Sequence, residues 1–300
     1  MEAVMEKASA APGNTTDAVV PAPTFFARLR WGKWLLLRRM SQAGILGLFL
    51  LGPWFGIWIV TGNLSSSMTL GVLPLTDPLL IMQSWAAGYM PYQDALIGVA
   101  IVVAFYLLVG GRVFCSWVCP VNPITDAAAA LRRKLGIKGG RAPAASTRYW
   151  LLGSLLVTAF VTGNMVWEFV NPVSMLHRGL IFGMGFGWLV VLGIFLYDLL
   201  VASRGWCGHL CPMGATYALL NRTAVPRVSA AKRAACDDCM DCFTVCPEPQ
   251  VIRPALKGDG SPLIKDPECT NCGRCIEVCA LDVFRFTTRF SASTHRRTTS

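Results

Sequence analysis

The chain has 300 residues, of which 54% are hydrophobic and only 15% are charged, and it carries a net charge of +10 and twelve cysteines. A typical soluble chain has roughly 25% charged residues, so this composition argues against a water-soluble globule. The positive charge does not indicate nucleic-acid binding, because the basic residues cluster beside long apolar runs, where juxtamembrane lysines and arginines usually lie. We therefore expect a membrane part and a second part that is organised by its cysteines.

Four apolar runs follow a polar N-terminal segment. Residues 1–26 and 291–300 lack periodicity and are expected to form disordered tails. Each apolar run is long enough to cross a hydrocarbon core of about 30 Å. The runs cover residues 43–62, 95–111, 149–166 and 179–201. The sequence thus predicts a helical membrane domain over residues 27–222, with four transmembrane helices and both termini on one side.

Loop charges predict which side this is. Basic residues gather before the first span and between the second and third, so these loops are expected in the cytoplasm of a bacterium, below its inner membrane. Residues 63–94 contain no Lys or Arg, and the loop between the third and fourth spans has only Arg178. Both are expected on the opposite face. The apolar stretch 73–85 is interrupted by Pro74 and Pro78, which favours a short interfacial or re-entrant segment over a fifth span.

The membrane domain repeats itself. A Thr-Gly-Asn sequence ends the first and third spans, and a Cys-x-x-x-Cys-Pro motif follows the second and fourth. Two copies of a two-helix unit in the same orientation form a parallel repeat, which brings corresponding residues to one membrane depth. We expect the four thiols to form one redox or metal site, and the alternative is a set of inert buried cysteines. Such a site could hold a further cluster, transfer electrons as a dithiol, or flank a quinone headgroup, and the sequence does not choose among these three roles. The cysteines are Cys115, Cys119, Cys207 and Cys211.

Beyond Arg222 the sequence becomes polar and rich in cysteine, which predicts a soluble domain over residues 223–290. The spacing Cys-x-x-Cys-x-x-Cys-x-x-x-Cys occurs twice, as in bacterial ferredoxins with two [4Fe–4S] clusters, where the fourth cysteine of each motif ligates the other cluster. We therefore expect an α+β ferredoxin-like domain. Its predicted ligands are Cys236, Cys239, Cys242 and Cys279 for cluster one, and Cys269, Cys272, Cys275 and Cys246 for cluster two.

A zinc or disulfide scaffold is the alternative for these cysteines. It is disfavoured because zinc sites seldom use three thiolates at such short intervals and disulfides are rare in the cytoplasm. Pro247 follows the fourth cysteine of the first motif, as is usual, whereas Ala280 takes that place in the second. Glu248-Pro249-Gln250 extends the first turn in an unusual way.

Histidines and ionisable groups near the membrane are few. The only histidines are His177, His209 and His295, and no Cys-x-x-Cys-His motif is present, so haem is not expected. Ionisable groups at the membrane often have a function, and here we expect them to transfer quinol protons. The alternative is that they are interfacial groups that are solvated or paired. They are Asp77, Glu168 and His177 on the outer side, and Asp198, Arg112 and His209 on the inner side.

A family resemblance rests on five stretches, which are Gly52-Pro53-Trp54-Phe55-Gly56, Pro74-Leu75-Thr76-Asp77-Pro78, Phe114-Cys115-Ser116-Trp117-Val118-Cys119-Pro120, Gly205-Trp206-Cys207-Gly208-His209-Leu210-Cys211-Pro212 and Cys239-Met240-Asp241-Cys242-Phe243. From about residue 31 to residue 290 the chain resembles the NapH family, the ferredoxin-type membrane subunits of quinol dehydrogenases that serve periplasmic nitrate reductase. The resemblance implies an oxidoreductase subunit that takes electrons from the membrane quinone pool and sends them toward a periplasmic ferredoxin-type partner and nitrate reductase.

Related membrane ferredoxins of nitrous oxide reduction, methylamine oxidation and cytochrome oxidase assembly share the cysteine motifs. The alternative function is therefore a membrane-anchored ferredoxin-type factor for redox assembly or maturation of a respiratory metalloenzyme. The loop charges put both clusters in the cytoplasm, whereas the acceptor implied by the resemblance is periplasmic. Either the transmembrane cysteines extend the electron path, or quinone carries electrons across, or the relationship with the partner differs from a simple relay.

Overall fold

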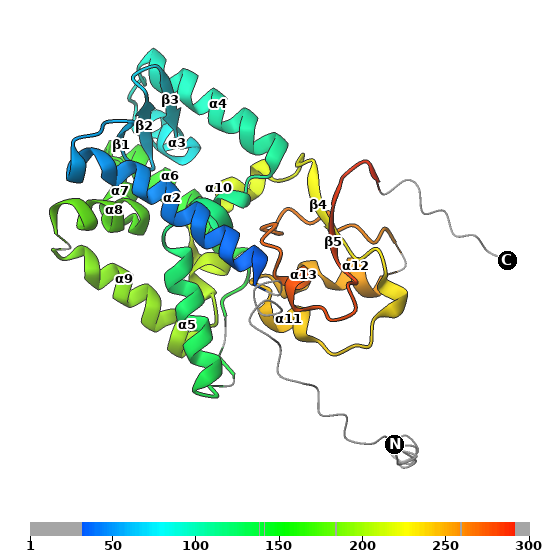
Figure 1. Cartoon of the computed structure of the whole chain (residues 1–300). Helices are drawn as coiled ribbons and strands as arrows, with labels where there is room; N and C mark the ends of the chain where they lie inside the picture. The colour runs from blue at the N-terminus through cyan, green and yellow to red at the C-terminus, as the bar shows by residue number, and fades with distance from the viewer. Residues whose placement is uncertain (1–31, 138, 141, 184, 259, 292–300) are drawn as a thin grey trace, which may run out of the picture.

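A computed structural model describes residues 32–291 of the chain, apart from residues 138, 141, 184 and 259. The described chain has a larger helical part and, beside it, a smaller part with short helices and a two-stranded sheet (Figure 1). The smaller part is called the cysteine-rich domain below. Of the two expected tails, only Ser291 lies within the described residues.

Helix α2, Lys33–Phe55, is the one helix among the described residues that is long and apolar enough to cross a membrane, by length and composition. The sequence placed the first span at residues 43–62, and these bounds are wrong at both ends. The early start was missed because the first turns are polar, yet Arg38 and Gln42 are buried within the protein. The end is set by Gly56, whose φ of +74° stops the helix.

The other expected spans correspond to shorter helices. These are α4, Gln93–Val109, α6, Thr147–Thr162, and α9, Gly187–Leu196, which continues as the π-helix η2, Tyr197–Val201. The expected fourth span is wrong as one continuous helix. Helix α8, Pro172–Phe182, ends at Gly183, which has a φ of +89°, and α9 begins only at residue 187. Membrane crossing by α4, α6 and α9 stays a prediction.

The segment expected on the outer face folds as a small sheet and a helix. Strands β1, Val60–Gly62, β2, Ser66–Thr69, and β3, Leu73–Thr76, pair antiparallel in that order, and α3, Pro78–Ala86, follows. The stretch 73–85, expected as one interfacial or re-entrant piece, is thus a strand and a short helix. Gln83 on α3 is fully buried, and its side chain accepts a hydrogen bond from the Trp167 backbone N–H at 2.9 Å. Trp167 lies on the short helix α7, Val166–Val170.

The cysteine-rich domain has the expected α+β character. Strands β4, Pro226–Ser229, and β5, Arg285–Thr288, pair antiparallel, and between them lie α11, Asp241–Val245, α12, Arg253–Lys257, and α13, Arg274–Val278. Short 3-10 helices, η4, Arg233–Ala235, and η5, Pro249–Val251, join them. The buried core includes Val228, Ile252, Ile264, Val283 and Phe284.

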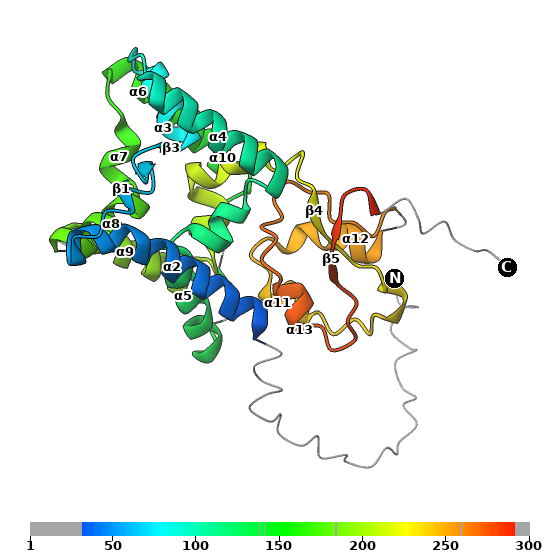
Figure 2. The ribbon, with the colours of Figure 1, turned by 45° about the horizontal axis from the view of Figure 1, so that its top comes forward.

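Helix α2 begins and helix α4 ends beside the cysteine-rich domain (Figure 2). The beginning of α6 and the loop after η2 also contact this domain, so the helices alternate in direction. The contacts join Trp34 to Glu277, Leu108 to Val225, Arg148 to Glu248, and Arg204 to Val245.

Buried ion pairs fasten the cysteine-rich domain to the helical part. Glu248, which is 1% exposed, accepts from Arg112 at 2.7 Å and from Arg148 at 3.0 Å. Glu268 pairs with the same two arginines, at 2.9 Å from Arg112, and also accepts from the Tyr149 hydroxyl at 2.6 Å. The unusual residue after Cys246-Pro247 in the sequence therefore has a structural role: it is the central carboxylate of this buried network.

In a second group of ion pairs, the helical part supplies the carboxylate and the cysteine-rich domain supplies an arginine. Asp126 lies on α5, Asn122–Lys134, and pairs with Arg274 of the cysteine-rich domain at 2.6 Å. It also pairs with Arg39 at 2.5 Å and with Arg204 at 3.4 Å. One carboxylate of the helical part thus joins α2, the loop after η2 and α13.

We predict that Glu248→Gln lowers the stability of the protein by on the order of 3 kcal/mol, because it leaves two buried guanidinium groups with less compensating charge. Burial opposes ionisation of Glu248, but Arg112 and Arg148 hold its pKa below the ordinary value of 4.5. Its contribution is therefore complete above pH 4.5 and lost as the pH falls through the lowered pKa.

Thermal unfolding of the full chain in detergent, followed between pH 3 and pH 7, measures both effects. Asp282→Asn is the matched control, because Asp282 is an exposed carboxylate of the same domain. An unfolding temperature for Glu248→Gln equal to that of the control would contradict the prediction.

Candidate metal centres

Two cavities in the cysteine-rich domain are each lined by four cysteines. The first cysteine cavity is lined by Cys236, Cys239, Cys242 and Cys279. The second cysteine cavity is lined by Cys246, Cys269, Cys272 and Cys275. The structure therefore brings the eight predicted ligands together in the crossed grouping, with the fourth cysteine of each motif in the cavity of the other. All these thiols are free of disulfide bonds.

The two cysteine loops have the same backbone conformation. Asp238 and Met240 have φ values of +62° and +63° in the first loop, and Asn271 and Gly273, at equivalent places in the second, have +47° and +75°. A left-handed conformation is costly for residues other than glycine, so its recurrence at equivalent positions indicates a constrained loop. Each loop leads into a five-residue helix, α11 or α13, whose C-cap is the crossing cysteine in an extended conformation.

The chemistry of the donors fits a cluster that binds thiolates. Burial and the neighbouring thiols Cys236, Cys239 and Cys279 raise the pKa of Cys242 to about 11. In the second cavity, burial and Cys272 raise the pKa of Cys269 to about 11. Thiols such as Cys242 and Cys269 resist losing their protons unless a cation core binds them, and the iron of a [4Fe–4S] cluster is such a core.

The two cavities differ in their surrounding charge. The first is lined by three carboxylates, Asp237, Asp238 and Asp241. The second is lined by Arg274 and by two carboxylates, Glu248 and Glu268, which are paired with arginines of the helical part. Arg227, which is 1% exposed, also acts on the second cavity, where its charge favours the thiolate of Cys269. Positive charge stabilises the reduced, more negative form of a cluster, so a cluster in the second cavity is expected to have the higher reduction potential.

We predict that Arg227→Gln lowers the reduction potential of the cluster in the second cavity and leaves the first nearly unchanged. A unit charge about 8 Å from a redox centre is worth on the order of 2 kcal/mol at an effective dielectric constant of about 20, or on the order of 90 mV for one electron. A potentiometric titration followed by EPR measures both clusters. Arg285→Gln, at an exposed position on β5, is the control. Equal shifts for both clusters would refute the assignment.

The two Cys-x-x-x-Cys-Pro motifs share one local structure in the helical part. Each begins with a π-helical turn, η1, Phe114–Val118, or η3, Trp206–Leu210. The Cys119 N–H donates to the carbonyl of Phe114 at 2.9 Å, and the Cys211 N–H donates to that of Trp206 at the same distance. Helices α5 and α10, Pro212–Leu220, then begin at or just after the motif proline. π-turns are rare and frequent at functional sites.

The four thiols of these motifs lie close enough to act on one another. Burial raises the pKa of Cys119, and Cys115 and Cys211 raise it further. Burial and Cys115 raise the pKa of Cys211 to about 12, and Cys207 is affected by the other three. We call this group the four-cysteine site. These mutual effects support the grouping expected from the parallel repeat. The grouping and its use as a metal or redox site both stay predictions.

Asp77 is the candidate carboxylate that reaches toward the four-cysteine site. It is 5% exposed and accepts a hydrogen bond from the Tyr217 hydroxyl at 2.9 Å. The Tyr217 ring stacks on Phe114, the residue before Cys115, with ring centroids 4.6 Å apart. Burial raises the pKa of Asp77 to about 7. The sequence singled out Asp77 but missed Tyr217, whose role depends on long-range packing of α10 against α3.

The remaining candidates are more dispersed. His177 is buried edge-on to Phe49, with centroids 5.5 Å apart, and its ring nitrogens have no hydrogen-bond partner among the described residues. His209 lies on η3, between the two cysteines of its motif. Glu168 accepts hydrogen bonds from neighbouring polar side chains, and Asp198 accepts from the Trp206 N–H at 2.9 Å. These two carboxylates therefore have structural partners, as Arg112 does.

Comparison with known proteins matches both groups of cysteines. A family profile described as "4Fe-4S binding domain" matches residues 93–138 and 182–230, which are the two segments with the Cys-x-x-x-Cys-Pro motifs. A second profile, "4Fe-4S dicluster domain", matches residues 228–280. No solved structure matches the chain. The protein is therefore an iron–sulfur electron-transfer protein of the ferredoxin type.

Similar proteins show to which family of iron–sulfur proteins the chain belongs. The methylamine utilization ferredoxin-type protein MauN of Methylorubrum extorquens is 53% identical over 261 residues, which cover 87% of this chain and 91% of that protein. The ferredoxin-type protein NapH is 49% identical over 261 residues in Escherichia coli, with the same coverage, and 50% identical over 275 residues in Haemophilus influenzae, covering 89% and 96%. The chain belongs to the NapH and MauN family of ferredoxin-type proteins, which confirms the resemblance.

Proposed function

We propose that the protein is the membrane subunit of a quinol dehydrogenase, in which the four-cysteine site connects a quinol-oxidising end to the two clusters of the cysteine-rich domain. The observation that carries the proposal is the position of the four-cysteine site between two partners. On one side, Phe114 and Tyr217 join it to the buried carboxylate of Asp77. On the other, Arg112 donates both to the Cys207 carbonyl, at 3.2 Å, and to Glu248.

In this proposal, the eight cysteines of the cysteine-rich domain hold two [4Fe–4S] clusters, and the four-cysteine site holds a third redox centre of the same kind. The match of residues 93–138 and 182–230 to a cluster-binding profile supports the third centre. When bound, a [4Fe–4S] cluster accepts or donates one electron at a time. Oxidation of one quinol supplies two electrons to two such centres and releases two protons.

The residues of this chain would manage one of those protons. Asp77, ionised, accepts a proton from the quinol hydroxyl, and the Tyr217 hydroxyl holds the carboxylate in place through its 2.9 Å hydrogen bond. The rings of Tyr106 and Phe114 pack on Tyr217 and exclude water from this position. A buried carboxylate with a pKa of about 7 is suited to accept and release protons near neutral pH.

We also propose four membrane spans with both termini in the cytoplasm of a bacterial inner membrane. The alternating directions of α2, α4, α6 and α9 support this arrangement, as do the basic residues in the last turn of α5. By similarity to NapH, electrons would pass to a periplasmic ferredoxin-type partner and nitrate reductase.

We predict that Asp77→Asn slows reduction of the clusters by a ubiquinol or menaquinol analogue by about 10²–10⁴-fold, the usual contribution of a general base. In the unmodified protein the rate should rise as the pH increases through about 7, because only the ionised carboxylate accepts a proton. The variant should lose this rise. Anaerobic stopped-flow absorbance of the purified full chain measures the rate.

Asp94→Asn is the matched control, since Asp94 is an exposed carboxylate at the start of α4. Fast, pH-dependent reduction of the Asp77→Asn variant would exclude Asp77 as the base. Complete inertness of the unmodified protein toward quinol, with transfer of electrons or metal to a client enzyme, would instead favour the assembly or maturation function.

We predict about twelve irons per chain in the anaerobically purified protein, and about eight in Cys211→Ser, because four cysteines bind each [4Fe–4S] cluster. The EPR signals of the two clusters in the cysteine-rich domain should persist in this variant, since their ligands are unchanged. Cys242→Ser is the informative comparison, because it should remove a signal from the cysteine-rich domain. Zinc in place of iron, or equal iron in the unmodified and Cys211→Ser proteins, would disprove a third cluster.

A further inference from the structure

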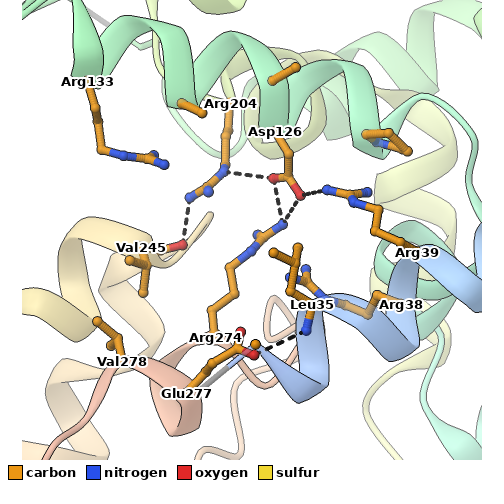
Figure 3. Close-up of a pocket in the computed structure, with 14 residues that line it drawn as sticks. Leu35, Arg38, Arg39, Asp126, Arg133, Arg204, Val245, Arg274, Glu277 and Val278 are labelled. Carbon is orange, nitrogen blue, oxygen red and sulfur yellow. Dashed lines mark hydrogen bonds and ion pairs between the residues drawn. The ribbon is translucent and has the colours of Figure 1, made fainter. Parts of the chain in front are cut away.

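A cavity of about 590 Å³ lies where α2 and α5 meet the helices of the cysteine-rich domain. Figure 3 shows the side chains that line it, with arginines from three parts of the chain directed toward a single aspartate. The cavity is open to the surroundings, and none of the cluster-ligand or four-cysteine residues lines it. It is therefore distinct from the three candidate redox centres. Its arginines are Arg38, Arg39, Arg133, Arg204 and Arg274.

These five cations face only two carboxylates, Asp126 and Glu277, so the lining has a surplus of three positive charges. Both carboxylates already have partners. Asp126 is shared by Arg39, Arg204 and Arg274, and Glu277 accepts from backbone N–H groups at the start of α2.

Arg38 is the observation that points to a ligand. Its side chain is 1% exposed, and its Nη1 is buried without a hydrogen-bond partner in the described part of the chain. A buried guanidinium N–H that has no acceptor is costly, and an anion in the cavity would supply one. Arg133 likewise lines the cavity and forms no ion pair with a carboxylate of the described residues.

Charge compensation of the second cysteine cavity accounts for part of this cluster. Arg38, Arg204 and Arg274 all act on Cys272. Charge compensation does not account for Arg133, which is exposed on α5. It also does not account for the open, largely apolar space beside the guanidinium groups. A ligand with one anionic end and an apolar body fits both features.

Apolar side chains also line the cavity, and one of them, Leu35, is 44% exposed near the start of α2. Leu35, Pro123, Ala127, Ala130, Val245 and Val278 line the cavity. On the same end of α2, Leu36, Leu37 and Met40 are exposed by 48%, 47% and 62%. In the proposed orientation this end lies at the cytoplasmic surface of the membrane, where anionic phospholipids present their phosphates to basic side chains.

We propose that this cavity binds the phosphate headgroup of an anionic phospholipid from the cytoplasmic leaflet, with the acyl chains leaving the cavity beside Leu35. The inference rests on the membrane orientation given under the proposed function. Guanidinium groups bind phosphate oxygens in pairs, so Arg38 and Arg133 supply donors that the protein itself leaves unused. The lipid would join α2, α5 and α13, and so stabilise the docking of the cysteine-rich domain.

Native mass spectrometry of the full chain, released from nanodiscs of phosphatidylglycerol or phosphatidylcholine, tests the site. We expect retention of phosphatidylglycerol in preference to phosphatidylcholine, and about fivefold to tenfold weaker retention for Arg133→Gln. Arg133 is exposed, so this variant is expected to fold, and unchanged EPR signals of the clusters verify that it does. Arg285→Gln is the control for loss of a positive charge elsewhere.

Equal retention of the two lipids, or equal retention by Arg133→Gln and its control, would overturn the proposal. Displacement of phosphatidylglycerol by millimolar inorganic phosphate would assign the site to free phosphate and would also overturn it. Reduction of the clusters by quinol is measured on the same samples. Normal quinol oxidation without lipid selectivity refutes the lipid site alone, and lipid selectivity without quinol oxidation refutes the proposed function alone.

Discussion

The docking of the cysteine-rich domain on the helical part depends on one buried group of charges, in which Arg112 and Arg148 share Glu248 and Glu268. Four ionised groups so far from water are stable only while every partner is present. The same arginines donate to the carbonyls of Cys207 and Gly208, at 3.2 Å and 2.7 Å. Each guanidinium thus fixes a π-turn of the four-cysteine site and a loop of the cysteine-rich domain together. This network therefore sets the spacing between the four-cysteine site and the cysteine-rich domain.

Local spacing explains how much of the site could be predicted from the sequence. The spacing of the two cysteine motifs predicted the crossed grouping, and Cys279 and Cys246 do line the cavities of the first and second motif, respectively. The π-turns and the start of α2 at Lys33 did not follow from it. Hydropathy assumes that charged residues face water, whereas Arg38 is buried against the cysteine-rich domain. Tyr217 was missed for a related reason, since its partner Asp77 is 140 residues away.

Both parts of the protein contain an internal repeat, and the two repeats have different consequences. In the cysteine-rich domain, the repeated loops hold the left-handed residues at matching positions but differ in charge, with Asp241 where the other loop has Arg274. A common backbone can therefore hold two clusters of different reduction potential. In the helical part, each repeated π-turn carries one Cys-x-x-x-Cys-Pro motif. In the proposed function, the two motifs together supply four donors to one site.

The positions of acids and bases separate the paths of protons and electrons. Asp77 lies at the side of the four-cysteine site away from the cysteine-rich domain, and it is held by Tyr217 on α10. The guanidinium groups of Arg112 and Arg148 lie at the other side, where their positive charge opposes the entry of a proton but favours an electron. In the proposed function, a proton released beside Asp77 would meet an electrostatic barrier in the direction of the cysteine-rich domain, toward which the electrons would pass. The protons and the electrons of quinol oxidation would then leave the site in different directions.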